Sequence, residues 1–548
     1  MRRAAWILLV SLALAQSVAS QTMSTIAGTR SQTWCGDGGA ATSACLNYPS
    51  DIAADAAGNL FVVDNRNNRI RKVSASGVIS TVAGNGTPSF GGDGGPAVNA
   101  SLYWPWNVAV DGHGKLFISD TYNHRVRKVT SLGTITTVAG SGPPWPDGGA
   151  FAGDGGPATA ARLRYPLGIA VDALGNLFIA DAGNHRIRRV DTAGIITTVA
   201  GNGSASFCGD GVPATSACLV TPRYLALHGG DLYFSDEGAQ RVRRIDTAGI
   251  ITTVAGNGTA SFCGDGGSAT SACLKTPYGV AVDGSGNLFI GDGANNRVRK
   301  VNPARTITTF AGIGSPEFCG DGGLATAACV NFPQGVTLDA AGRLLIADAY
   351  NGRIRRVAAG LASLTLAKPA VSGCLRTSGK VTLAAPAPAG GLRVSLSSDN
   401  PNAHVPTGVT IAAGATTKSF AITTDPVAAA ETATIEASAG GLLQHAALTL
   451  KPMAPKSVTL SPNPVAGGTH VAGTVALECA AGPGDITLTL WSTKPATASP
   501  DTPTVTVPAG STSAPFGVGT RTVAVLTKPS IKAQANGVTK AKVLAVSP

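Results

Sequence analysis

The fold is decided by the stretch PWNVAVDGHGKLFISDTYNHRVRKVTSLGTITTVAG, which runs from Pro105 to Gly140. Similar stretches begin, at spacings of 55 to 61 residues, at five other prolines: Pro49, Pro166, Pro222, Pro277 and Pro333. Self-similarity at a fixed period of this length indicates that one supersecondary unit is built several times. The sequence therefore predicts a repeat architecture over its first two thirds.

Each copy contains four β-strand signals. In different copies they read GVAVD, NLFIAD, RIRKV and IITTVAG, and turns rich in Gly or Asn separate them. Units of four strands repeated around a circle form a β-propeller, which leaves only short, protected sheet edges. The abundance of Gly and Pro and the scarcity of charged residues also favour an all-β protein with many turns.

The sixth copy lacks its fourth strand. After GRIRRV, Gly352 to Val357, no counterpart of TTVAG follows, but MSTIAG stands near the other end of the chain, from Met23 to Gly28. A strand from the N-terminus would complete the last blade and close the ring. We therefore expect six blades.

The repeat resembles the NHL repeat, whose pattern has a Pro-Gly-Val-Ala-Val-Asp strand, a Gly-Asn-Leu-Tyr-Val-Ala-Asp strand and an Asn-x-Arg-Ile strand. The resemblance covers about Ser24 to Val357, and all six copies match it. It implies an NHL-type six-bladed β-propeller over residues 21–360.

The long connections between blades carry paired cysteines. With alternating strand directions, these connections and the turns between second and third strands share one face, which we call the loop-rich face. In two connections both cysteines are replaced together, by Gly91 and Ser101 or by Ala152 and Arg162. Such joint loss predicts disulfides, each contributing about 2–3 kcal/mol by closing a short loop. The expected pairs are Cys35–Cys45, Cys208–Cys218, Cys263–Cys273 and Cys319–Cys329.

Two sets of aspartates recur. One stands in the GDG motif of each connection: Asp37, Asp93, Asp154, Asp210, Asp265 and Asp321. Calcium ligation is possible for a set of this kind, but we favour Asp-Gly turns whose carboxylates accept backbone N–H groups. The other set ends the second strands: Asp64, Asp120, Asp181, Asp236, Asp292 and Asp348. These stand about five residues before an Arg, and we expect them to hold the following turn by ion pairing and capping.

Some six-bladed relatives are enzymes, and the resemblance implies where their ligands would lie. Amidating lyases hold zinc with three histidines, and lactonase-like propellers hold a divalent ion with Glu, Asn and Asp. The four histidines of the repeats fall on opposite faces: His124 and His185 on the loop-rich face, His113 and His228 on the other. Glu237 and Glu317 are the only glutamates there, and no nucleophile–base arrangement stands out. We expect no catalytic residue, no metal site and no cofactor, with calcium left open. A divalent-metal-dependent lyase or lactonase-like hydrolase is the alternative.

A binding surface is indicated by positions that vary among nearly constant neighbours. The residue after each initial proline varies: Ser50, Trp106, Leu167, Arg223, Tyr278 and Gln334. These six should ring the channel mouth, and Trp104 and the expanded loop with Trp145 add aromatic groups. Aromatic rings beside Arg anchor peptides and sugars, although such variation also arises at unconstrained positions. The pattern predicts a site for a protein, peptide or glycan ligand.

From about Leu364 the composition shifts to Ala, Thr, Val, Pro and Ser. VTIAAGATTKSFAITT, Val409 to Thr424, is echoed by VTVPAGSTSAPFGVGT, Val505 to Thr520. Two immunoglobulin-like β-sandwiches fit, over residues 364–452 and 455–548. They resemble the tandem Ig-like modules of bacterial surface proteins. Each module holds one further cysteine, Cys374 or Cys479, as a free thiol or as half of a bridge between them.

The N-terminal residues 1–20 have the pattern of a signal peptide, with Arg2 and Arg3 before an apolar run and small residues at Val18 and Ser20. No later stretch reaches the roughly 20 apolar residues of a membrane span. The net charge is +11, but the basic residues recur once per repeat, so we expect no nucleic-acid partner. Taken together, these features predict a monomeric non-enzymatic binding or adhesion scaffold of bacterial type. It would be secreted, periplasmic or attached to the cell surface.

Overall fold

The chain divides into two units, one ending at Gly360 and the other beginning at Leu361. The computed structural model describes residues 21–143, 149–383, 387, 391–427, 429–439, 442–482 and 484–548. The segment expected to be a signal peptide and Trp145 lie outside the described residues. In the described part of the chain, no helix is both long and apolar enough to cross a membrane.

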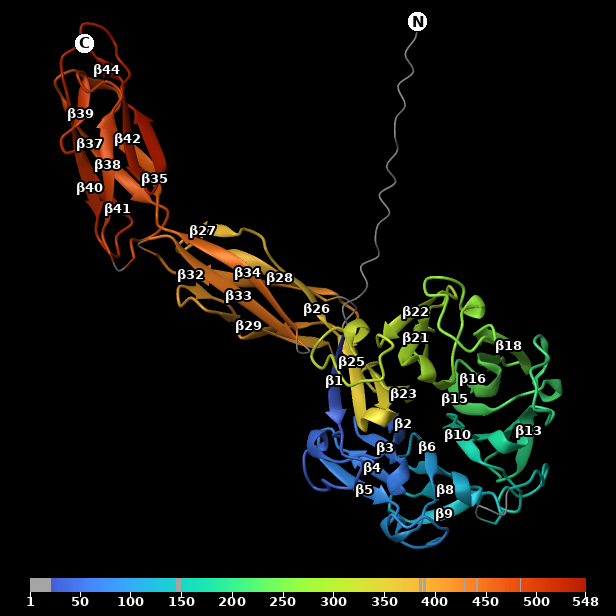
Figure 1. Ribbon diagram of the computed structural model, residues 1–548. Coiled ribbons are helices and arrows are strands. Elements are labelled where there is room, and N and C mark those ends of the chain that lie inside the picture. The colour runs from blue at the N-terminus through green and yellow to red at the C-terminus, as the bar shows by residue number, and fades with distance from the viewer. Residues whose placement is uncertain are drawn as a thin grey trace, which may run out of the picture. The chain divides into compact units, whose positions relative to one another are not determined.

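The first unit is a ring of six sheets, each with four main strands (Figure 1). The innermost strands are β2 (Pro49–Ala54), β6 (Pro105–Val110), β10 (Pro166–Val171), β15 (Pro222–His228), β19 (Pro277–Val282) and β23 (Pro333–Leu338). The second strands are β3 (Leu60–Asp64), β7 (Leu116–Asp120), β11 (Leu177–Asp181), β16 (Asp231–Asp236), β20 (Leu288–Asp292) and β24 (Leu344–Asp348).

The third strands are β4 (Arg69–Val73), β8 (Arg125–Val129), β12 (Arg186–Val190), β17 (Arg241–Ile245), β21 (Arg297–Val301) and β25 (Arg353–Ala359). The outer strands are β5 (Ile79–Ala83), β9 (Ile135–Ala139), β13 (Ile196–Ala200), β18 (Ile250–Ala255), β22 (Ile307–Ala311) and β1 (Gln21–Ala27). A two-residue strand, β14 (Val212–Pro213), extends the fourth sheet beyond β18. These are the four strand types that the repeat predicts.

Apolar side chains between the sheets hold the ring together. The innermost strands contact one another in the cyclic order β2, β6, β10, β15, β19, β23 and back to β2. Val108 and Ile118 of one sheet pack with Phe61 and Val63 of the sheet before it in a single buried cluster. Because every sheet buries both faces in this way, the alternating apolar residues of each strand are all used.

The ring is closed by the strand nearest the N-terminus. β1 pairs antiparallel with β25, with Met23 opposite Val357. Met23 is fully buried, in a cluster with Val336 and Ile346 of the same sheet and Val298 of the neighbouring one. The predicted exchange of the last outer strand is therefore observed.

Short 3-10 turns shape the loop-rich face. Those after the second strands are η2 (Asn65–Asn67), η4 (Thr121–Asn123), η5 (Ala182–Asn184), η7 (Glu237–Ala239), η9 (Gly293–Asn295) and η11 (Ala349–Asn351). Those in the connections are η1 (Ala41–Ser43), η3 (Ala97–Asn99), η6 (Ala214–Ser216), η8 (Ala269–Ser271) and η10 (Ala325–Ala327). The two kinds of loop meet, since Asn67 Nδ2 donates to the Thr33 carbonyl at 3.0 Å and Asn123 Nδ2 donates to the Ser89 carbonyl at 2.9 Å. The loop-rich face predicted from strand direction is thus present.

The second unit contains two β-sandwiches. In the first, β26 (Leu361–Leu366), β28 (Thr377–Leu383), β32 (Thr417–Thr424) and β30 (Ala403–His404) face β27 (Ala370–Ser372), β34 (Leu442–Lys451), β33 (Glu431–Ala439), β29 (Leu392–Ser398) and β31 (Gly408–Ile411). Val381 and Ile422 from one sheet share a core with Val394 and Ile435 from the other. Each sheet thereby buries one face and exposes the other.

The second sandwich repeats this arrangement. Its sheets are β35 (Pro455–Ser461), β37 (His470–Leu477), β41 (Ser513–Thr520) and β39 (Ala498–Pro500), then β40 (Thr504–Val507), β38 (Ile486–Ser492), β42 (Ser530–Ala535) and β43 (Val538–Val543), with the small pair β36 (Val465–Ala466) and β44 (Val546–Ser547). The echoed sequences occupy equivalent strands, β31–β32 and β40–β41. Cys374 and Cys479, left open by the sequence, form a disulfide within this unit.

The closing strand gives a test of the ring. Met23→Ala should lower the free energy of unfolding by about 2–5 kcal/mol, because it opens a cavity between two sheets. Leu174→Ala, at a side chain that is 79% exposed, should change it by less than about 0.5 kcal/mol. Chemical denaturation of the two variants beside the wild type measures both values. Equal stability of all three would contradict the packing of β1.

Candidate functional site

The loop-rich face is built around six buried arginines, one in the middle of each third strand: Arg71, Arg127, Arg188, Arg243, Arg299 and Arg355. All are fully buried. Arg71 shows the pattern: its guanidinium lies 2.6 Å from Asp37 of the connection and 3.2 Å from Asp64 at the end of β3. It also donates to the carbonyls of Cys35 and Cys45, at 3.0 and 3.3 Å. One guanidinium thus ties its own sheet to both ends of the long connection.

The aspartates of the GDG motifs are therefore ion-pair partners. Each of the six lies 2.5 to 2.8 Å from the buried Arg of its repeat. The expected acceptance of backbone N–H groups also occurs, since the Thr81 N–H donates to Asp37 Oδ2 at 3.0 Å. The sequence analysis missed the arginine because it lies 34 residues after the aspartate.

The aspartates that end the second strands cap and pair as predicted, with one difference. Asp64 Oδ1 accepts the Asn47 N–H at 2.7 Å, and Asn67 Nδ2 donates to Asp64 Oδ2 at 2.9 Å. Burial raises the pKa of Asp64 to about 6, while these donors and Arg71 act to lower it. The carboxyl therefore stays ionised at pH 7. Its ion-pair partner is the Arg seven residues later, Arg71, and not the nearer Arg69.

In five repeats a Phe ring lies over both the first and the third residue of the third strand, each an arginine, and in the first repeat Trp34 lies over Arg69. In each connection an aromatic residue stands directly before the first cysteine or before the residue that replaces it. These residues are Trp34, Phe90, Phe151, Phe207, Phe262 and Phe318. The Phe90 ring lies 4.0 Å from the Arg125 guanidinium and 4.9 Å from that of Arg127. These cation–π contacts shield the buried charges from water.

The four disulfides predicted from the sequence are confirmed: Cys35–Cys45, Cys208–Cys218, Cys263–Cys273 and Cys319–Cys329.

The six variable residues meet at the channel mouth, where they form what we call the channel plug: Ser50, Trp106, Leu167, Arg223, Tyr278 and Gln334. The Arg223 guanidinium lies 5.1 Å from the Trp106 ring and 4.5 Å from the Tyr278 ring. Ser50 Oγ donates to the Trp106 carbonyl at 2.7 Å, and Gln334 Nε2 donates to the Tyr48 hydroxyl. Ser50 and Gln334 are fully buried and Trp106 is 9% exposed. The plug therefore fills the mouth through contacts among its own members, and little of it is left for a ligand.

The exposed part of this region is an aromatic band around the plug. It consists of Tyr48, Tyr103, Trp104, Tyr122, Tyr165, Phe332 and Tyr350. The Trp104 and Tyr122 rings stack with centroids 5.0 Å apart, and Tyr350 meets Tyr48 edge-on at 5.1 Å. Tyr350 is 42% exposed and the others are half-buried. Of the predicted site residues, Trp104 is the one that joins this band.

Four members of the band stand directly before the proline of an inner strand with left-handed backbone: Tyr48, Trp104, Tyr165 and Phe332, at φ 47 to 56°. This conformation is strained for a non-glycine residue and needs outside support. Trp104 receives it from the preceding sheet, because its N–H donates to Asn68 Oδ1 at 2.9 Å; Tyr165 donates likewise to His124 Nδ1 at 3.1 Å. The turns thus aim the aromatic side chains.

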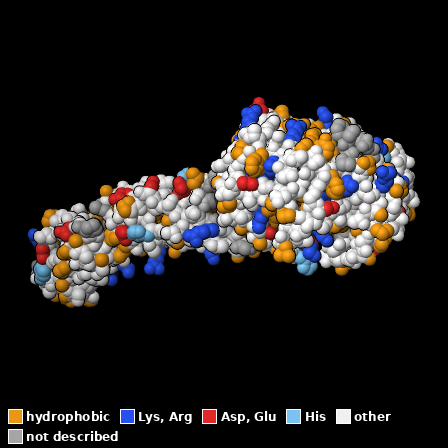
Figure 2. All heavy atoms as spheres, turned by 90° about the horizontal axis from the view of Figure 1, so that it is seen from below, with side chains coloured by type: hydrophobic (Ala, Val, Ile, Leu, Met, Phe, Trp, Pro, Cys, Tyr) orange, Lys and Arg blue, Asp and Glu red, His pale blue; other side chains and the backbone are white. Residues whose placement is uncertain are grey.

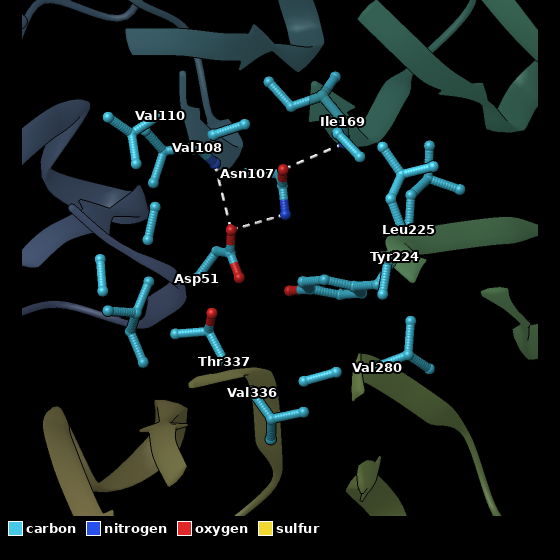
Figure 3. A pocket seen from close by; sticks show the side chains of 18 of the residues that line it. Asp51, Asn107, Val108, Val110, Ile169, Tyr224, Leu225, Val280, Val336 and Thr337 are labelled. Atoms are coloured by element: carbon cyan, nitrogen blue, oxygen red, sulfur yellow. Dashed lines mark hydrogen bonds between the residues drawn. The ribbon is translucent and has the colours of Figure 1, made fainter. Parts of the chain in front are cut away.

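Behind the plug lies a cavity of about 340 Å³ lined by all six inner strands (Figure 3). Asp51, Asn107 and Tyr224 project into it from three of the strands. Asn107 Nδ2 donates to Asp51 Oδ2 at 2.6 Å, and the Val108 N–H donates to the same oxygen at 3.2 Å. Burial raises the pKa of Asp51 to about 8. The sequence analysis missed these residues, although the repeat offers a signal: the same position is glycine in the other three copies.

The histidines and glutamates of the repeats do not converge. His124 accepts a backbone N–H, and burial lowers its pKa to about 4, so it is neutral at pH 7. His185 Nδ1 bonds the Val220 carbonyl at 2.7 Å, and Glu237 pairs with Arg223 at 3.2 Å. Over the described ranges, no three His, Cys, Asp or Glu side chains are grouped so that they could hold a metal ion.

Comparison with known families assigns the repeats. The family model described as the teneurin NHL domain matches residues 16–90, 143–207 and 257–317. The NHL repeat model matches residues 102–129 and 330–357. The repeats are NHL repeats. The all-β fold and the ring of sheets agree with this assignment.

The curated relatives of the NHL repeats include teneurins. Teneurin-m of Drosophila melanogaster is 30% identical over 366 residues, which cover 61% of this chain and 13% of the relative. Teneurin-4 of Mus musculus is 30% identical over 352 residues, which cover 57% of this chain and 12% of the relative. The chain therefore spans about an eighth of these proteins.

A solved structure from Bacteroides thetaiotaomicron, described as an auxiliary nutrient binding protein, is also similar. It aligns with a TM-score of 0.45 at 16% identity, over 62% of this chain and 76% of its own. A likeness at these values bears on neither fold nor function.

The surface of the NHL repeats is less basic than the amino-acid composition suggests. Six of the repeated arginines are buried and paired with aspartates, so they do not contribute to an external basic surface. Figure 2 shows the Lys and Arg side chains of one face scattered among other residues, with no single basic patch. Nucleic-acid recognition needs such a patch or stripe.

The buried arginines give a stability test. Arg127→Met should lower the free energy of unfolding by about 3–5 kcal/mol, since it leaves Asp93 and Asp120 without their partner. Arg162→Met, at an exposed side chain, should change it by less than about 0.5 kcal/mol. Denaturant titrations of both variants check this. If Arg127→Met unfolds like the wild type, the arginine does not organise the connection.

Asp51 gives a pH test. Its pKa is raised from about 4 to about 8 on folding, so the folded protein holds a proton that the unfolded chain releases. The stabilisation from Asp51 is complete below pH 4 and is lost as the pH rises to about 8, by about 1.4 kcal/mol per pH unit. Asp51→Asn should remove this loss, so its stability relative to the wild type should increase from pH 5 to pH 8. Parallel curves for the two proteins would contradict the raised pKa.

Proposed function

We propose that this protein is an exported, non-enzymatic binding or adhesion scaffold. It consists of a six-bladed NHL propeller and two immunoglobulin-like modules, and it binds a protein, peptide or glycan through the loop-rich face. The observation that carries the proposal is the aromatic band. Exposed or half-exposed aromatic rings gathered in one place are the usual anchors of peptide and sugar ligands.

The construction of the face supports a role in recognition. The connections are held by four disulfides and by buried Arg–Asp pairs, so the loops are fixed before any ligand arrives. A fixed surface loses less conformational entropy on binding than a mobile one. The left-handed backbone at Trp104 and Tyr165 fixes the direction of two side chains of the band.

The same disulfides support export. Stable structural disulfides are typical of proteins that fold in oxidising environments, and five cysteine pairs are joined in this chain. This supports export, as the N-terminal pattern predicts. In that setting the two sandwiches would act as spacers that present the propeller, or as adhesion modules.

The non-enzymatic part of the proposal is supported by the state of the polar side chains. All the aspartates of the recurring sets except Asp236 pair with arginines, Asp236 accepts backbone N–H groups, and the histidines of the loop-rich face bond backbone groups. A lyase or lactonase would need several of these groups free to bind a divalent ion. Metal analysis of the purified protein tests this part: a stoichiometric divalent ion that only a chelator removes would overturn it.

Binding by the aromatic band can be tested on peptide and glycan arrays, followed by titration with the strongest ligand. Trp104→Ala and Tyr350→Ala should each weaken binding by about tenfold or more. Leu132→Ala removes an exposed apolar side chain from the turn between β8 and β9, away from the band, and should bind like the wild type. Equal affinity of all four proteins would reject the band as the binding surface.

A further inference from the structure

The cavity behind the channel plug is closed at one end and accessible from the other. At the plug end its lining residues are buried: Asp51 and Asn107 are 5% exposed and Tyr224 is 3% exposed. Toward the far ends of the inner strands, Val110, Leu227 and the other lining side chains are only half-buried. A small molecule would therefore enter from the face opposite the aromatic band. At about 340 Å³ the cavity is within the usual range of ligand sites.

Asp51 is the one carboxylic acid among the described residues that line this cavity. The wall is otherwise formed by Val, Leu, Ile and Ala side chains, together with Asn107, Tyr224 and Thr337. None of the described residues that line it is Lys, Arg or His. The donors to the carboxylate are the Asn107 side chain and the backbone N–H groups of Val108 and Ile52, all uncharged. A buried carboxyl group without a cation is costly to ionise.

The repeat does not need this carboxyl group for folding. The equivalent residue is Asn107, Tyr224 or glycine in the other copies, while eleven of the twelve aspartates of the recurring sets are paired with arginine, Asp236 being the exception. Gly335 stands beside Asp51, where a Cβ would come too close to Asp51 Oδ1. The neighbouring strand thus leaves room for the carboxyl group. A group kept at a stability cost, at one position in six, indicates a function at that position.

We propose that this cavity is a binding site for a small organic ammonium ion with an apolar body, whose cationic head pairs with Asp51. The Tyr224 hydroxyl donates to the Ser50 carbonyl at 2.6 Å, which leaves its oxygen lone pairs free to accept an N–H group. The Thr337 hydroxyl is a further acceptor beside Asp51 (Figure 3). The Val, Leu and Ile side chains among the lining residues would contact an alkyl chain. This site is separate from the loop-rich face and does not depend on the function proposed there.

Binding at this site should be linked to a proton. Without ligand, Asp51 is largely protonated at pH 7, because burial raises its pKa and no charged group lines the cavity with it. An ammonium head stabilises the carboxylate, so the proton leaves as the ligand binds. Affinity should therefore rise about tenfold per pH unit between pH 6 and pH 7.5 and level off above pH 8.

The test uses n-hexylammonium as probe, with 1-hexanol as its uncharged counterpart. Calorimetric titration of the full chain should show hexylammonium binding at least tenfold more tightly than hexanol. Titration in two buffers of different ionisation enthalpy should show release of close to one proton per ligand at pH 6.5. Asp51→Asn should weaken hexylammonium binding at least tenfold and abolish proton release, with hexanol binding unchanged.

A second variant guards against misfolding of Asp51→Asn. Ala226→Phe fills the cavity from β15 without touching the carboxyl group and should also abolish binding of both probes. Leu132→Ala serves as the control and should bind like the wild type. Absence of hexylammonium binding to the wild type at millimolar concentrations would overturn the proposal. So would equal affinity for the two probes, or binding that survives in Ala226→Phe.

Discussion

The ion pairs of six buried arginines are the constraint on which the loop-rich face depends. A connection with few apolar residues cannot form a core of its own, so its position is set by polar contacts. Each guanidinium has five N–H donors. This number is enough to reach two carboxylates and the two backbone carbonyls at the ends of the connection at the same time. Because the arginine is fully buried, losing one acceptor leaves an uncompensated charge, and the loop can adopt few other positions. The disulfides add to this order; they are not its origin, because the second and third repeats keep the Arg–Asp pairs without any cysteine.

The same network explains how a ring of nearly identical sheets can still present a distinctive surface. Once the arginines, the aspartates and the aromatic ring above them fix each connection, the residues before and after the inner-strand proline are free to differ. The plug uses this freedom to close the channel, with Arg223 between two aromatic rings. The aromatic band uses it to place Trp104 and Tyr165 around the plug. The constant Arg–Asp network and the variable residues beside the inner-strand prolines therefore have the same structural origin.

Most of the architecture could be predicted from the sequence because it depends on periodicity. The strand types, the exchange of Met23 into the last sheet and the four disulfides all follow from comparing copies. Contacts that cross a repeat could not be derived in this way: Arg71 reaches back 34 residues to Asp37, and no local pattern links them. The burial of Ser50 and Gln334 was also beyond the sequence, because variable positions look alike whether they face solvent or one another. In the sequence, Asp51 stands out because three other copies have glycine at its position. That no cationic side chain lies beside it could be seen only in the three-dimensional structure.

The two faces of the ring differ in the way they treat charge. On the loop-rich face eleven of the twelve recurring carboxylates pair with an arginine, and Asp236 accepts two backbone N–H groups, so most of the charge there is compensated before any ligand binds. In the channel one carboxyl group lacks such a partner, and the surrounding Val, Leu and Ala side chains cannot supply one. Selection for stability alone would favour glycine or asparagine at that position, as in other repeats. In a fold built from repeats, a functional position can be recognised by a residue that differs from its counterparts. Asp51 differs in this way at a cost in free energy, and this is why it indicates a ligand.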